Sequence, residues 1–124
     1  MKEIIAIIRP SRAKLTKQRL AEKGFMAYTE ERVMGRGKQK GLRYSSLRNT
    51  AASLSDEKHE EAEVSFLPKR MLMLFVDNED VDQAIDVLME ANKTGEIGDG
   101  KIFICQMEDA VRIRTGEKGN TALS

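Results

Sequence analysis

Short apolar runs and looser alternations of apolar and polar residues mark four expected strands along this chain. The β-branched run at residues 4–8 predicts a buried strand, because a strand covered on both faces carries apolar side chains at every position. A looser alternation over residues 25–34 predicts a second strand. The runs at residues 71–76 and 101–107 predict a third and a fourth, and residues 111–114 a short extended continuation.

Two helices are expected, one between the first and second strands and one between the third and fourth. The first should begin with Ser11 as its cap and end near Gly24, and its apolar face is thin. The second should be capped by Asp77 or Asn78 and end at Thr94-Gly95. Its apolar residues recur at the i, i+3, i+4, i+7, i+8 spacing of an amphipathic helix. The apolar residues of the first helix are Ala13, Leu20 and Ala21, and those of the second are Val81, Ala84, Ile85, Leu88 and Met89.

The order of elements predicts an α+β fold of the ferredoxin-like βαββαβ class, in one domain that covers residues 1–124. Residues 36–66 form a long loop between the second and third strands, and residues 115–124 a mobile tail. Such a loop is either a solvated insertion or an arm that contacts a partner. Two helices can cover only one face of a four-stranded sheet, so we expect a homo-oligomer that covers the other face.

Composition narrows the class of protein. Hydrophobic residues make up 40% and charged residues 33% of the 124 residues, and the net charge of +1 gives no general attraction to nucleic acid or anionic lipid. The N-terminal apolar run is short and interrupted by Arg9-Pro10, so we expect no signal peptide and no membrane insertion. The single Cys105 lies in an apolar run, where we expect a buried strand thiol in a cytoplasmic protein.

Residues 94–101 carry the most informative motif, with three glycines in six positions followed by Lys101. Glycines allow positive φ and a close approach of the backbone to a ligand, and successive N–H groups can bind phosphate oxygens. The spacing G-x-x-x-x-G-K is formally that of a P-loop, but Ile102 stands where Ser or Thr should bind Mg²⁺, and the loop runs from helix to strand. The alternative is a glycine-rich turn that only closes an αβ unit.

Two further clusters strengthen the prediction of a polyphosphate site. Arg112 and Arg114 lie two residues apart on an expected extended segment, so their guanidinium groups should point the same way. The sequence GRGKQKG at residues 35–41 adds flexibility, positive charge and an amide that could contact a metal. A solvated strand face is the alternative for the two arginines.

The sequence shows no catalytic constellation, and we expect a protein that is not an enzyme. His59 is the only histidine and lies in an acidic part of the long loop. There is no Cys/His spacing for a metal, and no histidine is placed to activate a serine. An ATP-using enzyme and a nucleic-acid-binding module remain alternatives, the first because ferredoxin-like folds also host catalysis, the second because the first half of the loop is basic.

Taken together, these clusters resemble the PII family of nitrogen-regulatory signal proteins. The resemblance covers nearly the whole chain apart from the long loop, and its last two segments together are the most specific. The segments that carry it are IIAIIRP at 4–10, GRGKQKG at 35–41, FLPK at 66–69, TGEIGDGKIF at 94–103 and RIRTGE at 112–117.

The resemblance implies a homotrimer of ferredoxin-like subunits with ATP or ADP in each cleft between neighbours. It also implies that Gln39 helps to coordinate Mg²⁺ on ATP and that 2-oxoglutarate chelates this Mg²⁺. The residues implied for the nucleotide are Ile7, Thr29, Gly35, Gly37, Lys38 and Gln39, with Gly98, Asp99, Gly100 and Lys101 at the phosphates and Arg112 and Arg114 from the adjacent subunit. Those implied for 2-oxoglutarate are Arg9 and Lys69, with the backbone near Gln39 and Gly98.

The long loop corresponds to the family's T-loop, which docks on target proteins and would be reordered by metabolite binding at its base. Tyr44 lies in a context unlike the uridylylation site of many relatives, so nucleotidylation is not expected. The loop and the ending are similar to the longer partner of nitrogenase-associated PII-like proteins, which work in pairs of related subunits and inhibit dinitrogenase when fixed nitrogen is plentiful. Regulation of an ammonium channel or of glutamine synthetase is the alternative.

Overall fold

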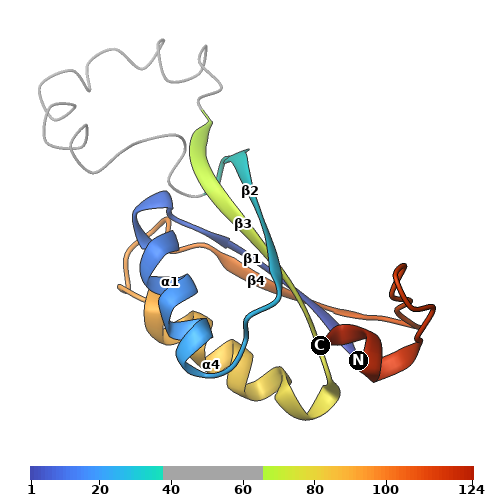
Figure 1. The fold of residues 1–124 in the computed structure, drawn as a ribbon. Coiled ribbons are helices and arrows are strands. Elements are labelled where there is room, and N and C mark those ends of the chain that lie inside the picture. Colours follow the sequence, from blue (N-terminus) through green and yellow to red (C-terminus); the bar gives the residue numbers. More distant parts are fainter. Residues whose placement is uncertain (38–65) are drawn as a thin grey trace, which may run out of the picture.

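A computed structural model describes residues 1–37 and 66–124 of the chain, and it contains four strands and two α-helices (Figure 1). Of these helices, none in the described ranges is both long enough and apolar enough to cross a bilayer. The elements in chain order are β1 (Lys2–Ile8), α1 (Pro10–Glu22), β2 (Tyr28–Gly35), β3 (Leu67–Val76), the 3₁₀ helix η1 (Asn78–Asp80), α4 (Val81–Asn92), β4 (Lys101–Gln106) and the 3₁₀ helix η2 (Gly119–Leu123).

The four strands form one antiparallel sheet in the order β2-β3-β1-β4. This order, with α1 and α4 side by side on one face of the sheet (Figure 1), is the ferredoxin-like α+β arrangement that the order of elements predicts. β2 ends at Gly35 and β3 begins at Leu67, and these two residues are partners in the ladder. The strand bounds therefore place the long loop where the sequence predicts it.

The hydrophobic core lies between the sheet and the two helices. Alternate residues of β1 and β3 point to this side, because successive side chains of a strand face opposite ways. Each fully buried aliphatic side chain contributes about 1.5–3 kcal/mol to stability. The buried core residues are Ile4, Ala6 and Ile8 of β1, Leu72, Leu74 and Val76 of β3, Ala13 and Leu20 of α1, and Ala84, Val87 and Leu88 of α4.

The opposite face of the sheet, which we call the open face, is also apolar. The ladder pairs Ile5 with Met73 and with Phe103, and Ile7 with Met71. These side chains are partly or largely exposed, and Phe103 retains 49% of its surface. No described element covers them, so the structure agrees with the expectation that this face needs a partner.

The start and the packing of α1 differ from the prediction. Pro10 is the first helical residue and Arg9 is the cap, whereas Ser11 was expected there. Proline suits this position because its missing N–H would have no helical partner and its φ is already helical. Ala21 is exposed, and its place in the buried stripe is taken by Thr16, whose hydroxyl donates to the Arg12 carbonyl at 2.7 Å and thereby becomes compatible with burial.

The second helix is likewise shifted from its predicted face and start. Asp77 precedes η1 rather than α4, whose cap is Asp80, and among the described residues neither helix has a side-chain cap. Met89 is 45% exposed, while Val87 and Ala91 are buried. The expected i, i+3, i+4 stripe was therefore wrong at its C-terminal end, where Val87 and Ala91 rather than Met89 lie on the buried face of α4.

The C-terminal segment departs furthest from the predictions. Cys105 is exposed on the open face, whereas a buried thiol was expected. Residues 111–114 do not continue β4 as an extended strand: Val111 forms a single bridge with Lys118, and a tight turn lies between them. Residues 115–124 contain η2, from which Asn120 donates to Asp77 at 3.0 Å. The mobility of this tail stays a prediction.

Candidate functional site

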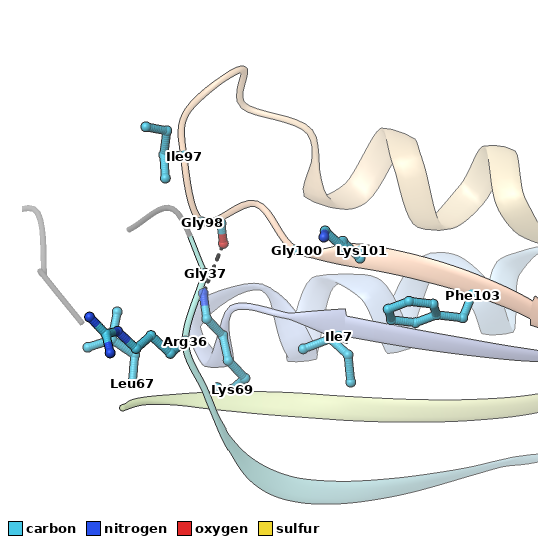
Figure 2. Close-up of a pocket in the computed structure, with 11 residues that line it drawn as sticks. Ile7, Arg36, Gly37, Leu67, Lys69, Ile97, Gly98, Gly100, Lys101 and Phe103 are labelled. Carbon is cyan, nitrogen blue, oxygen red and sulfur yellow. Dashed lines mark hydrogen bonds between the residues drawn. The ribbon is translucent and has the colours of Figure 1, made fainter. Parts of the chain in front are cut away.

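A cleft of about 460 Å³ opens at the end of the sheet where β1 and β2 finish and β3 and β4 begin (Figure 2). It is lined by one residue of β1, by both ends of the long loop, and by the segment from Ile97 into β4. Seven of its lining residues were predicted from the sequence: Ile7, Gly35, Gly37, Lys69, Gly98, Gly100 and Lys101. Segments far apart in sequence thus meet where a phosphate and carboxylate site was expected.

Four lining residues were not named as site residues: Arg36, Leu67, Ile97 and Phe103. Phe103 could have been found from the sequence, because it lies two residues after Lys101 in a strand and therefore shares its face. Leu67 and Ile97 carry no comparable signal, since only the closing of the sheet brings them together. These side chains make the wall of the cleft mostly apolar, with the cations Arg36, Lys69 and Lys101 on it.

The glycines of the loop 94–100 have the backbone geometry that the sequence predicts. Gly95, Gly98 and Gly100 have φ of 86°, 100° and 111°. At Gly100 a second constraint applies, because a Cβ atom built there would lie 1.8 Å from the carbonyl oxygen of Ile7. Gly100 is thus required for the close approach of this loop to β1, and this approach forms one wall of the cleft.

Lys69 points into the cleft toward the glycine loop. Its ammonium group donates to the carbonyl oxygen of Gly98 at 3.0 Å, as the dashed line in Figure 2 shows. Burial lowers the pKa of Lys69 below that of a free lysine, the Arg9 guanidinium lowers it further, and the Asp99 carboxylate partly offsets both. An arriving anion would favour the charged form of Lys69 and would find a cation already directed at the loop.

Asp99 is not among the residues that line the cleft, although the resemblance placed it among the phosphate ligands. It lines an adjoining space of about 290 Å³ beside the end of α4, which shares Ile7, Gly100 and Lys101 with the cleft. Its carboxylate accepts from the backbone N–H groups of Thr94 at 2.8 Å and Gly95 at 2.9 Å, and from the Thr94 hydroxyl. Burial opposes its charged form, but these hydrogen bonds and the one from Arg9 prevail and hold the pKa of Asp99 well below its ordinary value.

Arg9 is likewise engaged by the loop, and it is not one of the residues that line the cleft. One of its guanidinium nitrogens pairs with Asp99, and the other donates to the carbonyl oxygen of Ile97 at 2.8 Å. Arg9 therefore ties the end of β1 to the glycine loop. Its expected contact with a bound keto acid stays a prediction.

Three predicted nucleotide-binding residues are not among those that line the cleft. Thr29 lies on β2 in register with Met73 and Ile5, in the middle of the sheet. Arg112 and Arg114 follow the end of β4, at the opposite end of the sheet from the glycine loop. The six residues of β4 separate the arginines from the glycine loop by about 20 Å. Arg112 pairs with Glu117 at 2.8 Å and donates to the carbonyl oxygens of Thr121 and Ser124.

Several predicted residues lie outside the described ranges. They include Lys38 and Gln39, for which the resemblance implies contacts with the nucleotide and Mg²⁺, as well as Tyr44 and His59. Within the described ranges, no group of three or more His, Cys, Asp or Glu side chains could hold a metal ion. The described part of the cleft therefore offers cations, backbone amides and an apolar wall, which fit a phosphate-bearing ligand with an aromatic body.

Comparisons with known proteins agree with this arrangement. Residues 1–117 match the family described as nitrogen regulatory protein P-II. The chain is 46% identical over 123 residues to the nitrogen fixation nifHD region GlnB-like protein 2 of Methanobacterium ivanovii, with 99% of each chain covered. It is 38% identical to nitrogen regulatory protein P-II 2 of Methanothermobacter thermautotrophicus, with 99% and 97% covered.

A solved structure is also similar. PII of Arabidopsis thaliana bound to citrate superposes with a TM-score of 0.72 at 29% identity, and the match covers 98% of this chain and 88% of that one.

Proposed function

Since the chain belongs to the nitrogen regulatory protein P-II family, we propose that it is a signal protein that binds ATP or ADP and 2-oxoglutarate and acts on a target through its long loop. The observation that carries the proposal is the cleft in which Lys69, Lys101 and the glycine loop converge. Lys101 and the positive-φ glycines suit the anionic tail of a nucleotide, Lys69 suits a carboxylate bound beside it, and the apolar wall suits the base. Because ATP and 2-oxoglutarate are metabolites of the cytoplasm, we propose that the protein acts there.

The proposed site is completed by a second copy of the chain. Arg112 and Arg114 follow the end of β4, at the far end of the sheet from the glycine loop, so they cannot reach a ligand that the same subunit's loop holds. A neighbouring subunit that packs on the open face could bring its far end to this cleft. We therefore propose a homotrimer, or a hetero-oligomer with a related PII-like subunit, with nucleotides in the clefts between neighbours.

We propose that 2-oxoglutarate binds beside the nucleotide and that its binding requires Mg²⁺. The acid would meet Lys69 and the backbone at Gly98, and Gln39 would contribute to the Mg²⁺ site. Mg²⁺ would supply a positive centre that the keto acid and the triphosphate share. A dianion needs such a centre in addition to a lysine, because its removal from water is costly. The solved Arabidopsis relative binds citrate, another polycarboxylate, which supports an anion site in this fold.

The target we propose is a nitrogenase component, inhibited when fixed nitrogen is plentiful and released when ATP and 2-oxoglutarate bind. Support comes from relatives at 39–46% identity that are named for the nitrogen fixation nifHD region. The loop begins and ends at the cleft, because Gly35 and Leu67 both line it. Ligand binding there could therefore change how the loop is presented. An ammonium channel or glutamine synthetase is the alternative target.

Isothermal titration calorimetry tests the binding proposal directly. We expect ATP and ADP to bind, 2-oxoglutarate to bind only with Mg-ATP present, and ATP turnover to stay at background. Absence of heat at millimolar ATP would contradict the proposal. A pull-down from nitrogen-fixing cells, with and without ATP and 2-oxoglutarate, then separates a nitrogenase component from the alternative targets.

Lys69→Met is expected to weaken 2-oxoglutarate binding in Mg-ATP by about 100-fold, because it removes a charged hydrogen-bond donor from the carboxylate. Binding of ATP alone should change by less than about threefold, since a single lysine at the edge of the phosphates contributes little there. Lys101→Met is the matched variant, and it should weaken ATP binding more than Lys69→Met does. Equal effects of Lys69→Met on both ligands would contradict this assignment.

The same lysine should make 2-oxoglutarate binding dependent on pH. The pKa of Lys69 is lowered in the free protein, and a bound carboxylate raises it again. The affinity for 2-oxoglutarate should thus be highest below the pKa that Lys69 has in the free protein. It should decline as the pH rises through the pKa that Lys69 has in the complex. Titrations between neutral and alkaline pH should show this decline in the wild type, and Lys69→Met should lack it.

A further inference from the structure

Asp99 makes more hydrogen bonds than any other side chain in the described part of the glycine loop. Three of its partners belong to the opening of the loop itself, namely the two N–H groups at Thr94 and Gly95 and the Thr94 hydroxyl. The fourth is Arg9, which directly follows the last residue of β1 and also donates to the carbonyl oxygen of Ile97. One carboxylate thus closes the loop on itself and fastens it to the sheet.

The far side of the loop is fastened independently. Lys69 donates to the carbonyl oxygen of Gly98, the residue next to Asp99. The loop is therefore held between Arg9 and Lys69, with its glycine backbone directed along the cleft (Figure 2). Glycines cost the most conformational entropy to order, so a loop with three of them binds an anion well only if it is ordered beforehand.

We propose that Asp99 is a positioning residue for anion binding: it does not contact the ligand, but it pre-orders the glycine loop whose amides receive phosphate oxygens. This inference rests on the proposed nucleotide site. It also explains why a carboxylate lies beside a site for anions. The negative charge of Asp99 is compensated by the ion pair with Arg9 and by hydrogen bonds from two backbone N–H groups.

The direction in which one substitution changes the affinity for an anion separates this role from a simple electrostatic one. Removing a negative charge near a bound anion should by itself strengthen binding. Removing a carboxylate that orders the loop should weaken it, because binding must then order the loop. Asp99→Asn keeps the shape of the side chain, loses the charge, and replaces one acceptor oxygen by a donor that faces other donors.

We expect Asp99→Asn to weaken ADP binding about tenfold in calorimetry, which corresponds to the loss of a charged hydrogen bond. Glu96→Gln is the matched control. It removes the same charge from the same loop, at an exposed side chain that makes no ion pair or hydrogen bond within the described ranges. The affinity of Glu96→Gln for ADP should equal that of the wild type or be slightly higher. An Asp99→Asn affinity at or above that of Glu96→Gln would overturn the proposal.

Amide hydrogen exchange supplies a readout that does not depend on the ligand. In Asp99→Asn the amides of Thr94 and Gly95 should exchange about tenfold faster, while those of β1 and β3 keep their protection. Unchanged exchange at these two amides would refute the ordering role. If wild-type protein failed to bind ADP, the proposed function would fall, and the exchange rates would still decide whether Asp99 orders the loop.

The partnership with Arg9 gives a second check of the same idea. If both residues act through the loop, the losses of ADP affinity in Arg9→Gln and Asp99→Asn should not be additive. The double variant should then bind ADP with about the same affinity as the single variant that binds it less tightly. Fully additive losses of affinity would show that Arg9 and Asp99 act separately, which contradicts a shared ordering role.

Discussion

Gly100→Ala is expected to lower the free energy of unfolding by about 4 kcal/mol or more and to abolish nucleotide binding, the largest effect of any single substitution at the cleft. Two costs combine at this position. A φ of +111° is strained for alanine, and the new methyl group would lie 1.8 Å from the backbone oxygen of Ile7. This oxygen belongs to the central strand β1, so it cannot move without disturbing the ladder between β1 and β4.

Gly95→Ala is the matched control for this experiment. Gly95 lies in the same loop with φ +86°, but no described atom lies within 4 Å of the position of its Cβ. Its substitution should cost only the backbone strain of about 1–2 kcal/mol. Urea denaturation of both variants measures the difference, and ADP titration shows whether the cleft survives. Similar losses of stability would show that the contact with Ile7 does not restrict residue 100.

Met73→Glu is expected to dissociate the proposed trimer into single chains while leaving each chain folded. Met73 lies in the middle of the open face, where it pairs with Ile5 and Thr29. In a monomer its side chain is partly exposed, so a carboxylate there remains hydrated. In an interface between sheets the carboxylate would lose water, at a cost of at least about 2 kcal/mol per subunit. Analytical ultracentrifugation would report the change of mass.

The same variant tests whether the nucleotide site is shared between subunits. If Arg112 and Arg114 come from a neighbour, monomers should bind ATP at least about tenfold more weakly, because two charged donors are lost from the phosphates. Asp82→Lys is the control, because Asp82 is exposed on α4, which covers the face of the sheet opposite to the open face. This variant should still form the trimer and should bind ATP with wild-type affinity. A monomeric Met73→Glu protein with wild-type ATP affinity would contradict a shared site.

The sheet, the two helices and most of the cleft could be predicted because they follow from patterns that are local in sequence. The apolar run at residues 4–8 and the spacing from Val81 to Leu88 reflect the periods of a strand and a helix. Gly95, Gly98 and Gly100 similarly indicated a loop with positive φ, as the structure confirms. The resemblance to PII proteins then joined these segments into one site, of which seven described residues meet in the cleft.

The errors arose where a neighbour distant in sequence decides the environment. Cys105 and Met89 are apolar residues within apolar patterns, yet both are exposed because no described element packs over them. Asp99 stood in a motif that indicated phosphate binding, but Arg9, 90 positions away, supplies a hydrogen-bond donor on the other side, beside the donors of the nearby Thr94 and Gly95. A carboxylate turns to the nearest donors, and the sequence does not reveal which donors folding will bring there.

By itself, then, the sequence determined which segments are strands, which are helices, and where the backbone needs glycine, since these depend on residues a few positions apart. Only the tertiary structure decided that Gly100 lies against Ile7, that Asp99 lines the adjoining space rather than the cleft, and that the arginines lie at the other end of the sheet. These facts depend on how β1 and β4 pair and on which way the loop closes. The pairing joins residues far apart in sequence, and the loop closes through Arg9, 90 positions from Asp99, together with its own Thr94 and Gly95.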